Sequence, residues 1–371
     1  MWDHPGIGRY IRELSAALIS FSSEYQFTFY GYTKVTGPAT SASPPEGEPA
    51  DVLMAGASPV TFVNTRSKVY SILEQFEIPF SYKNTDLLHI PHFNIPVFYP
   101  KKLVVTVHDL TYLHDPGASR APLAGIYAHF LLKVISKKAS AILTVSEYTK
   151  NDLLNSFPGL RPDKVFVTHE AVSPFFRKVD DPEILKRAKK TFSLEKPFVL
   201  SVGSLKPHKN IPALIRAIAA LRTKKEFSHE LVLVGRKDEN NPELLKLMQE
   251  HSFVHYLGEL GDEDILLLYN LTDVFVLPSF REGFGLPVLE AMACGAPVIC
   301  SNQTSLPEVA GEAGLFFDPH KVDALEELLY NILQNNELRK KMSRAGLERV
   351  KQFSWERTAK KTLEVYRKVL G

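Results

Sequence analysis

The chain has 371 residues, of which 44% are hydrophobic and 23% charged, and its formal net charge is +2. This length fits about two domains, the near-neutral charge disfavours a nucleic-acid-binding protein, and no apolar run approaches the roughly 20 residues that span a bilayer. Cys294 and Cys300 have the spacing of neither a zinc pair nor a redox pair, so we expect reduced thiols and a cytoplasmic protein.

The N-terminal half alternates helical and strand patterns. We expect helices over 7–21 and 121–138, and strands over 27–32, 87–90, 103–107, 141–145 and 164–168. Residues 36–49 are rich in Pro, Gly, Ser and Ala and predict a surface loop. This order of elements favours a parallel sheet that is covered by helices on both faces.

A Gly-x-Gly pattern, Gly6–Ile7–Gly8, leads into the first helix. By itself this pattern is weak evidence of phosphate binding. A doubly wound domain normally feeds such a loop from a buried strand, yet only residues 1–5 precede Gly6. We therefore expect either a chain that starts further upstream or a sheet that is one strand short; pairing by Met1 and Trp2 is the third option.

The strand over 103–107 ends at His108, which position alone makes either a structural or a catalytic histidine. His89, His92 and Asn94 surround the preceding strand. They could face an acceptor or be ordinary polar residues of a loop. No carboxylate accompanies them at metal-ligand spacing, so we expect no metal site there.

The helix over 121–138 has two interpretations. Its apolar residues lie beside three lysines and could dock on a membrane surface, or they could face the core below a solvated polar face. The residues concerned are Ala128, Leu131, Leu132 and Ile135, with Lys133, Lys137 and Lys138. We favour the core-facing interpretation.

Polar residues and prolines between residues 173 and 182 indicate a domain boundary, which we place after residue 174. The first domain then covers 1–174 and the second 175–351. A final amphipathic helix in 352–371 must pack on another element. In the second domain we expect strands over 198–202, 231–234, 253–257, 274–277, 297–300 and 315–317, and helices over 211–221, 242–251, 262–270, 287–294 and 322–333.

A basic segment, Leu205–Asn210, follows the strand over 198–202 and precedes a helix. A phosphate group would meet a helix start there, and Lys209 is the natural point charge for a diphosphate. The alternative is a solvated lysine in a loop.

The most informative segment is Arg281–Gly295, which sets two glutamates around a glycine-rich turn. Pro287 suits the first helical position, so residues 283–286 would aim free backbone N–H groups into a cleft, as at a phosphate site. Glu290 lies in a helix that is otherwise apolar, where an unpaired charge is costly and a ligand hydroxyl could satisfy it. A structural carboxylate is the alternative.

Segment Pro278–Asp318 contains two glutamates separated by seven residues, followed by Ser305–Val309 and Gly314–Asp318. This segment strongly resembles the donor site of glycosyltransferase family 4, whose members are retaining enzymes. The resemblance implies an α/β protein of the GT-B fold, with two doubly wound Rossmann-like domains and a donor cleft between them. It also implies that the last helix crosses back onto the N-terminal domain.

The resemblance also implies roles for individual residues. Lys209, with N–H groups of the first glycine loop and of the turn after Glu282, would hold the donor diphosphate without a metal ion. Glu282 would hold sugar hydroxyls, Glu290 the ribose diol, and His108 would complete the sugar pocket. The donor-binding set is Gly6, Gly8, Ser204, Lys209, Leu257, Gly283, Phe284, Gly285, Leu286 and Glu290, in which Leu257 frames the base.

One position departs from the family pattern. Many relatives have Arg or Lys directly after the glycine at 203, where this chain has Ser204, so a second fixed cation is in doubt. Lys206 or His208 could substitute, or Ser204 could only hydrogen-bond the phosphate.

The implied function is metal-independent transfer of a hexose, with no cofactor, from a nucleotide diphosphate sugar to a glycan or lipid-linked acceptor. We expect GDP-mannose first and a UDP-sugar second. Contact with the inner face of a membrane is compatible with such an acceptor. A front-face transfer is favoured, with a transient covalent intermediate as the alternative. Two other classes of function remain as alternatives. One is a nucleotide-sugar epimerase or hydrolase, and the other is a non-catalytic protein that binds a nucleotide sugar.

Overall fold

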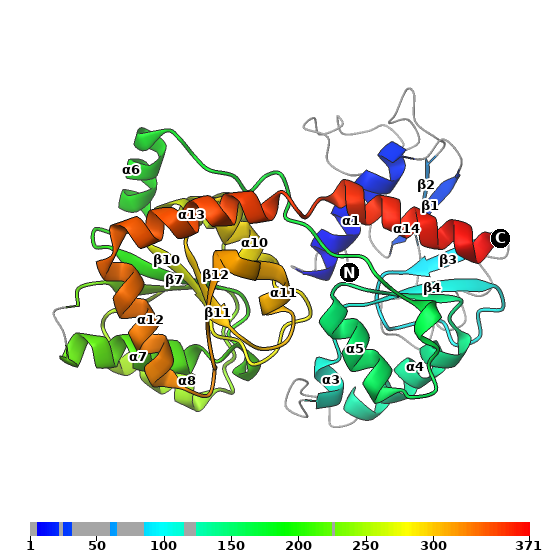
Figure 1. The fold of residues 1–371 in the computed structure, drawn as a ribbon, viewed down its shortest axis with the longest axis horizontal. Helices are drawn as coiled ribbons and strands as arrows, with labels where there is room; N and C mark the ends of the chain where they lie inside the picture. The colour runs from blue at the N-terminus through cyan, green and yellow to red at the C-terminus, as the bar shows by residue number, and fades with distance from the viewer. Residues whose placement is uncertain (1–5, 22–24, 32–59, 65–84, 115–123, 225–226) are drawn as a thin grey trace.

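A computed structural model describes residues 6–21, 25–31, 60–64, 85–114, 124–224 and 227–371. Two parallel sheets lie side by side in an elongated molecule, and each sheet has helices on both faces (Figure 1). The predicted alternation of strands and helices is therefore confirmed in both halves of the chain. Residues 1–5, 36–49 and 121–123, on which predictions were made, lie outside the described residues.

The C-terminal sheet has six parallel strands in the order β12-β11-β10-β7-β8-β9. The strands are β7 (Phe198–Val202), β8 (Glu230–Val234), β9 (Val254–Tyr256), β10 (Val274–Leu277), β11 (Val298–Ser301) and β12 (Gly314–Phe317). The chain lays down β7, β8 and β9 outward in one direction, then returns to add β10, β11 and β12 in the other. The order therefore reverses between β7 and β10, which is the place where doubly wound sheets bind ligands.

Helices cover both faces of this sheet because its strands are apolar on both sides. One apolar core joins β7, β8, β10 and β11 to α7, α8 and α12, and the other joins the opposite faces to α9 and α10. The helices are α6 (Pro182–Thr191), α7 (Ile211–Lys224), α8 (Pro242–Glu250), α9 (Asp262–Leu271), α10 (Leu286–Ala293), α11 (Leu306–Ala310), α12 (Val322–Gln334) and α13 (Asn336–Val350). Short 3₁₀ turns η3 (Pro207–Lys209) and η4 (Gly311–Ala313) connect them.

The N-terminal sheet has four parallel strands in the order β3-β4-β5-β6. They are β3 (Leu87–Ile90), β4 (Lys102–Val107), β5 (Ala141–Thr144) and β6 (Val165–Val167), with a 3₁₀ turn, η2 (Pro162–Lys164), before β6. A separate parallel pair is formed by β1 (Phe27–Gly31) and β2 (Val60–Asn64). The helices of this half are α1 (Ile7–Phe21), α3 (Thr111–His114), α4 (Ala124–Lys138) and α5 (Glu147–Ser156).

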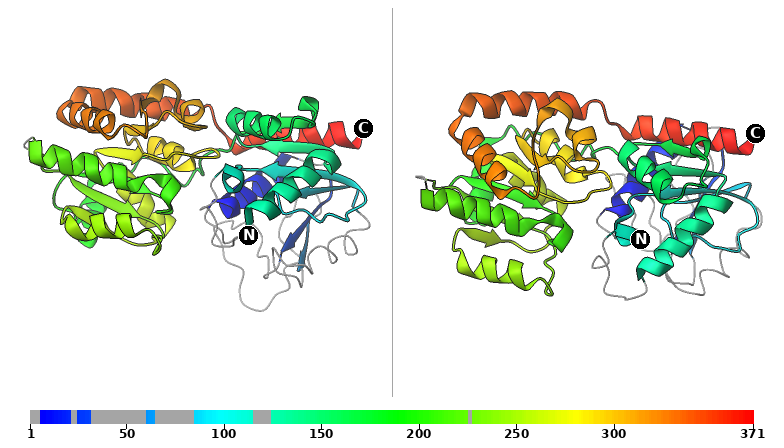
Figure 2. Two further views of the ribbon diagram at one scale, coloured as in Figure 1. Left: turned by 90° about the horizontal axis from the view of Figure 1, so that it is seen from below. Right: turned by 60° about the horizontal axis from the view of Figure 1, so that its bottom comes forward.

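Alternating residues of β4 divide the N-terminal core into two layers. Val104 packs with α1 and the last helix, α14 (Trp355–Leu370), whereas Val105 packs with α4. Figures 1 and 2 accordingly show α14 and α4 on opposite sides of this sheet. The core-facing interpretation of α4 is correct, because Leu131 and Ile135 are fully buried.

Helix α14 follows the second sheet in sequence but lies against the first. Ser354 caps its N-terminus by accepting a hydrogen bond from the Arg357 N–H at 3.2 Å. Leu363 and Tyr366 are buried against α1, β4 and β5. The Tyr366 hydroxyl also meets Nδ1 of His89 at 2.5 Å, so the amphipathic stripe predicted for this helix is used for packing on the N-terminal half.

Sequence patterns missed several elements, namely β2, α3, α5, α11 and α13. The boundaries of the predicted and described elements otherwise agree to within a few residues. Every helix among the described residues is too short or too polar to cross a membrane.

Candidate active site

The carboxyl ends of β7 and β10 bring two predicted residues into direct contact. Nζ of Lys209 donates to both carboxylate oxygens of Glu282, at 2.7 and 2.8 Å. Ser279 donates to the same carboxylate at 2.6 Å. The Phe280 N–H donates to the His208 carbonyl at 2.8 Å, which ties the two loops together. The predicted diphosphate lysine and sugar-binding glutamate thus form one site at the switch point of the sheet.

The glycine turn after Glu282 lies directly against the N-terminal half. A Cβ at Gly283 would stand 2.2 Å from the His108 carbonyl oxygen and 3.0 Å from Cβ of Asp109. Ser146, the residue that caps α5, donates to the Gly283 carbonyl at 2.8 Å. Only glycine permits so close an approach.

The turn ends at Gly285, whose φ of 104° lies in the left-handed region. A Cβ there would meet Leu306 at 2.6 Å. Helix α10 then begins at Leu286, with Pro287 in its first turn as predicted. The buried Phe284 contacts the rings of His169 and Phe353 and so fixes the turn from behind. The helix start lies four residues after Glu282 in sequence, and its dipole favours an anion.

Glu290 is buried in α10, and both of its carboxylate oxygens accept hydrogen bonds from other side chains of the protein. Arg9 donates to one carboxylate oxygen, and the Tyr269 hydroxyl donates to the other at 3.1 Å. Burial raises the pKa of Glu290 above its ordinary value, and Arg9 opposes this shift. The sequence suggested that a ligand hydroxyl could satisfy Glu290; in this structure the side chains of Arg9 and Tyr269 do so. A ribose diol would have to replace Arg9.

Arg9 belongs to this candidate site by its contacts, although sequence reasoning gave it no role. Gly8 is buried in the first turn of α1, and Arg9 reaches from there to Glu290 and to Asp262, the latter at 2.5 Å. A signal was present, because a cation in the first turn of a helix opposes the helix dipole and needs a carboxylate from elsewhere. Its guanidinium also lies 5.1 Å from the ring centre of Phe176.

His108 uses both ring nitrogens inside the N-terminal half. Nδ1 lies 3.1 Å from Glu170, and Nε2 lies 3.0 Å from the Pro91 carbonyl. Burial by itself would lower the pKa of His108, but Glu170 and the Pro91 carbonyl raise it above its ordinary value. Both partners are hydrogen-bond acceptors, which favours a proton on each ring nitrogen of His108. Its main chain, by contrast, faces Gly283.

His208 precedes Lys209 in the described turn η3, and one of its ring nitrogens is buried and unsatisfied. Its Nδ1 has no hydrogen-bond partner. Burial lowers the pKa of His208, and the neighbouring charge of Lys209 lowers it further. The ring is therefore neutral near pH 7, so it does not supply the second cation that Ser204 lacks.

The remaining predicted residues are spread around this centre. Ser204 follows β7 and is partly exposed. Leu257 follows β9, and its N–H donates to the Leu233 carbonyl of β8 at 3.0 Å. Gly6 lies at the start of α1, where its carbonyl accepts from the Tyr10 N–H at 3.1 Å. The structure brings Lys209, Glu282 and the turn 283–286 together, whereas Gly6 and Gly8 form the start of α1 instead of an open loop.

The three polar residues near β3 all form contacts inside the protein, and two of them, His92 and Asn94, have buried side chains. His89 meets Tyr366 and Thr106, and burial lowers its pKa to about 3, so it is a neutral packing residue beneath α14. His92 accepts from the Asn94 N–H at 3.2 Å, and Asn94 accepts from the hydroxyl of Tyr127 at 2.9 Å. His92 and Asn94 thus link α4 to the segment that holds His108, and His89 does not belong to that set.

Further contacts hold the two halves together around the turn. Glu308 of α11 accepts from the backbone N–H groups of Glu147 and Tyr148 at 2.9 and 3.2 Å, and from His169 at 2.6 Å. It thereby neutralises the N-terminus of α5 across the cleft. Arg281 donates to Asp152 of the same helix at 3.1 Å.

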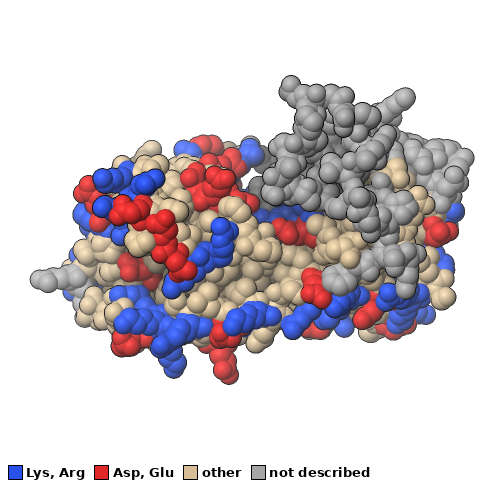
Figure 3. Space-filling model, turned by 90° about the horizontal axis from the view of Figure 1, so that it is seen from above, with Lys and Arg blue, Asp and Glu red and all other residues tan. Residues whose placement is uncertain are grey.

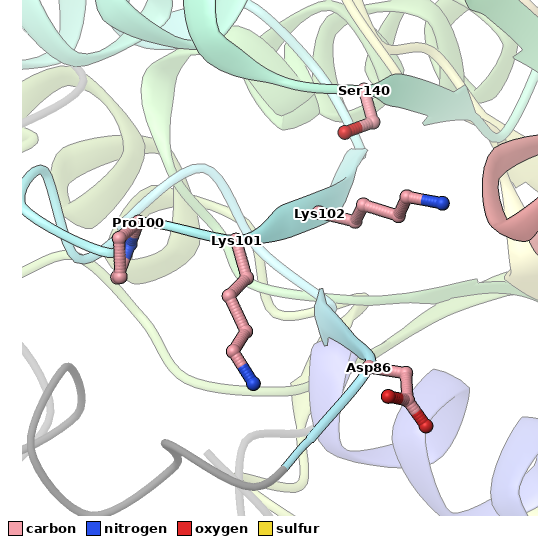
Figure 4. A pocket seen from close by; sticks show the side chains of 5 residues that line it. All are labelled: Asp86, Pro100, Lys101, Lys102 and Ser140. Atoms are coloured by element: carbon pink, nitrogen blue, oxygen red, sulfur yellow. The ribbon is translucent and has the colours of Figure 1, made fainter.

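Two cavities open on the described surface. One of about 560 Å³ lies beside Arg9 and is lined by Glu13, Phe175 and Asp262 among others. The other, of about 500 Å³, lies at the amino edge of the N-terminal sheet (Figure 4). There Lys102 donates to the Leu370 carbonyl of α14 at 2.8 Å. Among the described residues, no three His, Cys, Asp or Glu side chains gather in a way that could hold a metal ion.

Comparisons with known proteins match both halves of the chain. The family described as Glycosyltransferase Family 4 matches residues 5–174, and the family described as Glycosyl transferases group 1 matches residues 183–349. The O-antigen chain mannosyltransferase B of Escherichia coli is 34% identical over 284 residues, which are 76% of this chain and 74% of that protein. The serotype-specific mannosyltransferase WbdA of Escherichia coli is 30% identical over 85% of this chain, which spans only 38% of that relative.

Solved structures match the fold. Sucrose-phosphate synthase from Thermosynechococcus elongatus superposes with a TM-score of 0.73 over 98% of this chain and 93% of that one, at 21% identity. Anabaena HepE in complex with UDP-glucose superposes with a TM-score of 0.69 over 84% of this chain and 86% of that one, at 18% identity. These likenesses confirm the predicted GT-B arrangement of two Rossmann-like sheets.

Proposed function

Because the chain belongs to the group 1, family 4 glycosyltransferases, we propose that it transfers a hexose with retention from a nucleotide diphosphate sugar, without a metal ion. The observation that carries this proposal is the pairing of Lys209 with Glu282 at the switch point, beside the start of α10. The lysine and the helix start offer fixed positive charge to a diphosphate. The carboxylate of Glu282 offers a hydrogen-bond acceptor to the hydroxyl groups of a sugar.

The chemistry requires stabilisation of the departing diphosphate. When the donor binds, Lys209 exchanges Glu282 for phosphate oxygens, and the start of α10 faces the charge that develops there. Glu282 is then free to accept hydrogen bonds from sugar hydroxyls. Glu290 binds the ribose diol after Arg9 has moved from it. These steps use groups that already lie in place and need no divalent cation.

Retention of configuration is proposed from the family, whose members are retaining enzymes. Glu282 is assigned to the sugar hydroxyls and Glu290 to the ribose diol, so neither carboxylate is assigned as a nucleophile. We therefore favour a front-face transfer, in which an oxygen of the leaving phosphate takes the proton of the acceptor hydroxyl. His108 is held by Glu170 and the Pro91 carbonyl, and its main chain contacts Gly283, so we assign it to the wall of the sugar pocket.

The donor sugar is proposed from the relatives. Mannosyltransferase B and WbdA are named as mannosyltransferases, which favours mannose, with GDP as the first nucleotide and UDP as the second. The HepE complex holds UDP-glucose and supports a nucleotide-sugar donor of this general kind. The acceptor is a glycan or lipid-linked glycan. We place the reaction in the cytoplasm because Cys294 and Cys300 are free thiols.

A thermal-shift panel of nucleoside diphosphates and their sugars tests the donor, because a ligand that binds the folded chain raises its melting temperature. Transfer with the best donor is then followed with and without EDTA, and the anomeric configuration of the product is determined by NMR. We expect transfer in EDTA and a retained configuration. Loss of transfer in EDTA that Mg²⁺ or Mn²⁺ restores would contradict the metal-independent mechanism.

Two further assays separate the other classes. Release of free nucleotide without an acceptor would indicate a hydrolase or epimerase, and tight donor binding without turnover would indicate a binding protein. Glu282→Gln is the matched variant, since it removes a charge without changing the size of the side chain. It should reduce transfer while nucleoside diphosphate still binds.

A further inference from the structure

Helix α4 has an outward stripe that mixes apolar and basic side chains. Ile126 is 69% exposed and Phe130 is 52% exposed. Lys133 and Lys137 are also exposed. These four residues recur at i, i+4, i+7 and i+11, so they lie on one face of the helix, opposite the buried face that packs on the sheet. Large apolar side chains grouped in this way mark an interaction surface.

The neighbouring loop extends this surface. Phe98 is 65% exposed, and the loop that carries it follows α4 closely. Asn94, at one end, accepts from the hydroxyl of Tyr127, and the Val97 carbonyl accepts a hydrogen bond from Lys138 at the other end of the helix. We use the name α4 face for Phe98, Ile126, Phe130, Lys133 and Lys137.

Neither segment contains an acidic residue. Residues 92–102 and α4 together carry five lysines and no Asp or Glu. On the face that holds α13 and α14, by contrast, acidic and basic side chains alternate (Figure 3), as in the pair of Lys340 with Glu337 and the pair of Lys360 with Glu356. The absence of negative charge from these two segments, beside exposed apolar groups, fits an anionic, apolar partner and disfavours a basic one.

The helix that carries the α4 face is connected to the segments around His108. A Cβ at Gly125, at the start of α4, would lie 3.1 Å from the carbonyl of Tyr112 in α3, which follows β4 and His108. Tyr127 is linked through Asn94 to His92, and the adjacent Pro91 accepts from His108. Figure 2 shows α4 on the outside of the N-terminal half.

We propose that the α4 face is a docking surface for an anionic phospholipid bilayer. Ile126, Phe130 and Phe98 enter the boundary between headgroups and acyl chains, and Lys133 and Lys137 contact lipid phosphates. The proposal deepens the proposed function, because docking by this face places the His108 side of the cleft close to a lipid-linked acceptor. A few apolar side chains and lysines give reversible binding, and no spanning segment is required.

The test is sedimentation of the full chain with vesicles of phosphatidylcholine, either alone or mixed with phosphatidylglycerol. We expect binding to the mixed vesicles that weakens with salt. Ile126→Ser with Phe130→Ser should lower the partition coefficient by about tenfold or more, because both side chains lose their transfer free energy. Lys133→Gln with Lys137→Gln should lower it roughly fivefold per lysine, on mixed vesicles only.

Helix α6 supplies a matched control, because it also carries an exposed apolar residue, Ile184, and an exposed lysine, Lys189. Ile184→Ser with Lys189→Gln should leave vesicle binding unchanged. Melting temperatures show that each variant folds. Equal binding by the wild type and the Ile126→Ser, Phe130→Ser variant, or equal binding to neutral and mixed vesicles, would overturn the proposal.

A second copy of the chain is the other occupant that the test detects. If light scattering shows a dimer that the Ile126→Ser, Phe130→Ser variant loses, while vesicles capture nothing, then a protein interface covers this face and the proposal is wrong. Nucleoside diphosphate binding separates this proposal from the proposed function. A wild type that binds nucleotide but not vesicles contradicts docking alone, whereas a wild type that binds no nucleotide contradicts the donor site.

Discussion

Arg9 in the first turn of α1 donates to Glu290 in α10, across 281 positions of sequence. The contact joins a helix of each half of the molecule. It also occupies the carboxylate to which the donor ribose is proposed to bind. Both groups are largely buried, so each protects the other from an uncompensated charge. Under the proposed function, the donor ribose and Arg9 compete for this carboxylate.

Replacing Arg9 with Ala should destabilise the protein more at high pH than at low pH. Burial already raises the pKa of Glu290, and without Arg9 that pKa rises further. A carboxyl group whose pKa is higher in the folded than in the unfolded state loses stability as the pH rises through the folded value. We expect a loss of about 3–5 kcal/mol at neutral pH or above.

Thermal unfolding of Arg9→Ala and of the wild type, followed from about pH 5 to about pH 8, measures this difference. Adding Glu290→Gln to Arg9→Ala removes the buried charge and should restore most of the melting temperature. A deficit that does not change with pH would show that Arg9 acts only through packing.

Replacing Gly283 with Ala should impair transfer without weakening nucleotide binding. The new Cβ would stand 2.2 Å from the His108 carbonyl, so the turn and the end of β4 must move apart. Under the proposed function the nucleoside diphosphate is held mainly by Lys209 and the start of α10, which the new methyl group does not touch, so it should keep most of its affinity. Transfer depends on both halves and should fall by about tenfold to a hundredfold, as for a misplacement of about 1 Å.

Gly261→Ala is the matched control, because no atom lies within 4 Å of a Cβ at Gly261. Calorimetric titration with nucleoside diphosphate and a transfer assay on both variants give the two readouts. Equal loss of nucleotide affinity and transfer in Gly283→Ala would mean that the turn supports nucleotide binding instead of closure.

Binding of a nucleoside diphosphate should drive proton uptake by His208. Burial keeps the pKa of this histidine low, and Lys209 and Lys206 add to the effect, whereas Glu282 and Asp109 oppose it. A diphosphate beside Nδ1 would raise the pKa and give the unsatisfied nitrogen an acceptor. The affinity should therefore increase as the pH falls toward 6.

Titration calorimetry in two buffers of different ionisation enthalpy measures the protons taken up. His208→Gln should remove the part that belongs to the protein, while His251→Gln, at the end of α8, should not. The same uptake in wild type and His208→Gln would assign the proton to another group.

Glu308→Gln should weaken the contact between α11 and α5 at neutral pH. Burial by itself would raise the pKa of Glu308, but hydrogen bonds from His169, Glu147 and Tyr148 hold it below its ordinary value. Its contribution to stability is therefore present above the ordinary carboxyl pKa and is lost as the pH falls through the folded value. At neutral pH we expect a loss of about 1–3 kcal/mol.

Melting curves of wild type and Glu308→Gln over a range of pH test this expectation. The two should converge at acidic pH, where Glu308 of the wild type is protonated. The exposed Glu312, four residues further on, is the control, and its change to Gln should have little effect at any pH. Curves that stay parallel would indicate that the charge of Glu308 is not involved.

Local pattern was sufficient to assign Lys209 and Glu282 to one site, although their direct contact was not predicted. Each residue follows a buried strand, and the carboxyl ends of parallel strands meet at one edge of a sheet. The same logic does not reach Glu290, because its partner Arg9 lies in helix α1 of the other half, 281 positions away in sequence, and no periodic pattern links the two. Glu170, which holds His108, follows β6 at the same edge of the N-terminal sheet, so the same logic reaches it although the prediction missed it.

The missed helix α13 has a different cause. Of its fifteen residues only Met342 and Gly346 are buried, so the helix has no apolar stripe for a sequence pattern to detect. Asn335 caps its N-terminus, and Gly346 admits Met292 of α10 at 3.1–3.5 Å from a would-be Cβ. Such a helix is specified by its cap and by one close contact, which only the folded chain shows.

The position of α14 affects how the protein can be synthesised. Val104 and Leu143 need Leu363 and Tyr366 as their cover, yet those two residues are translated more than two hundred positions later. During translation one apolar face of the N-terminal sheet is partly exposed to solvent while the whole second sheet is synthesised. A chaperone, or early burial by α1 alone, has to protect this face until the ribosome has passed Tyr366.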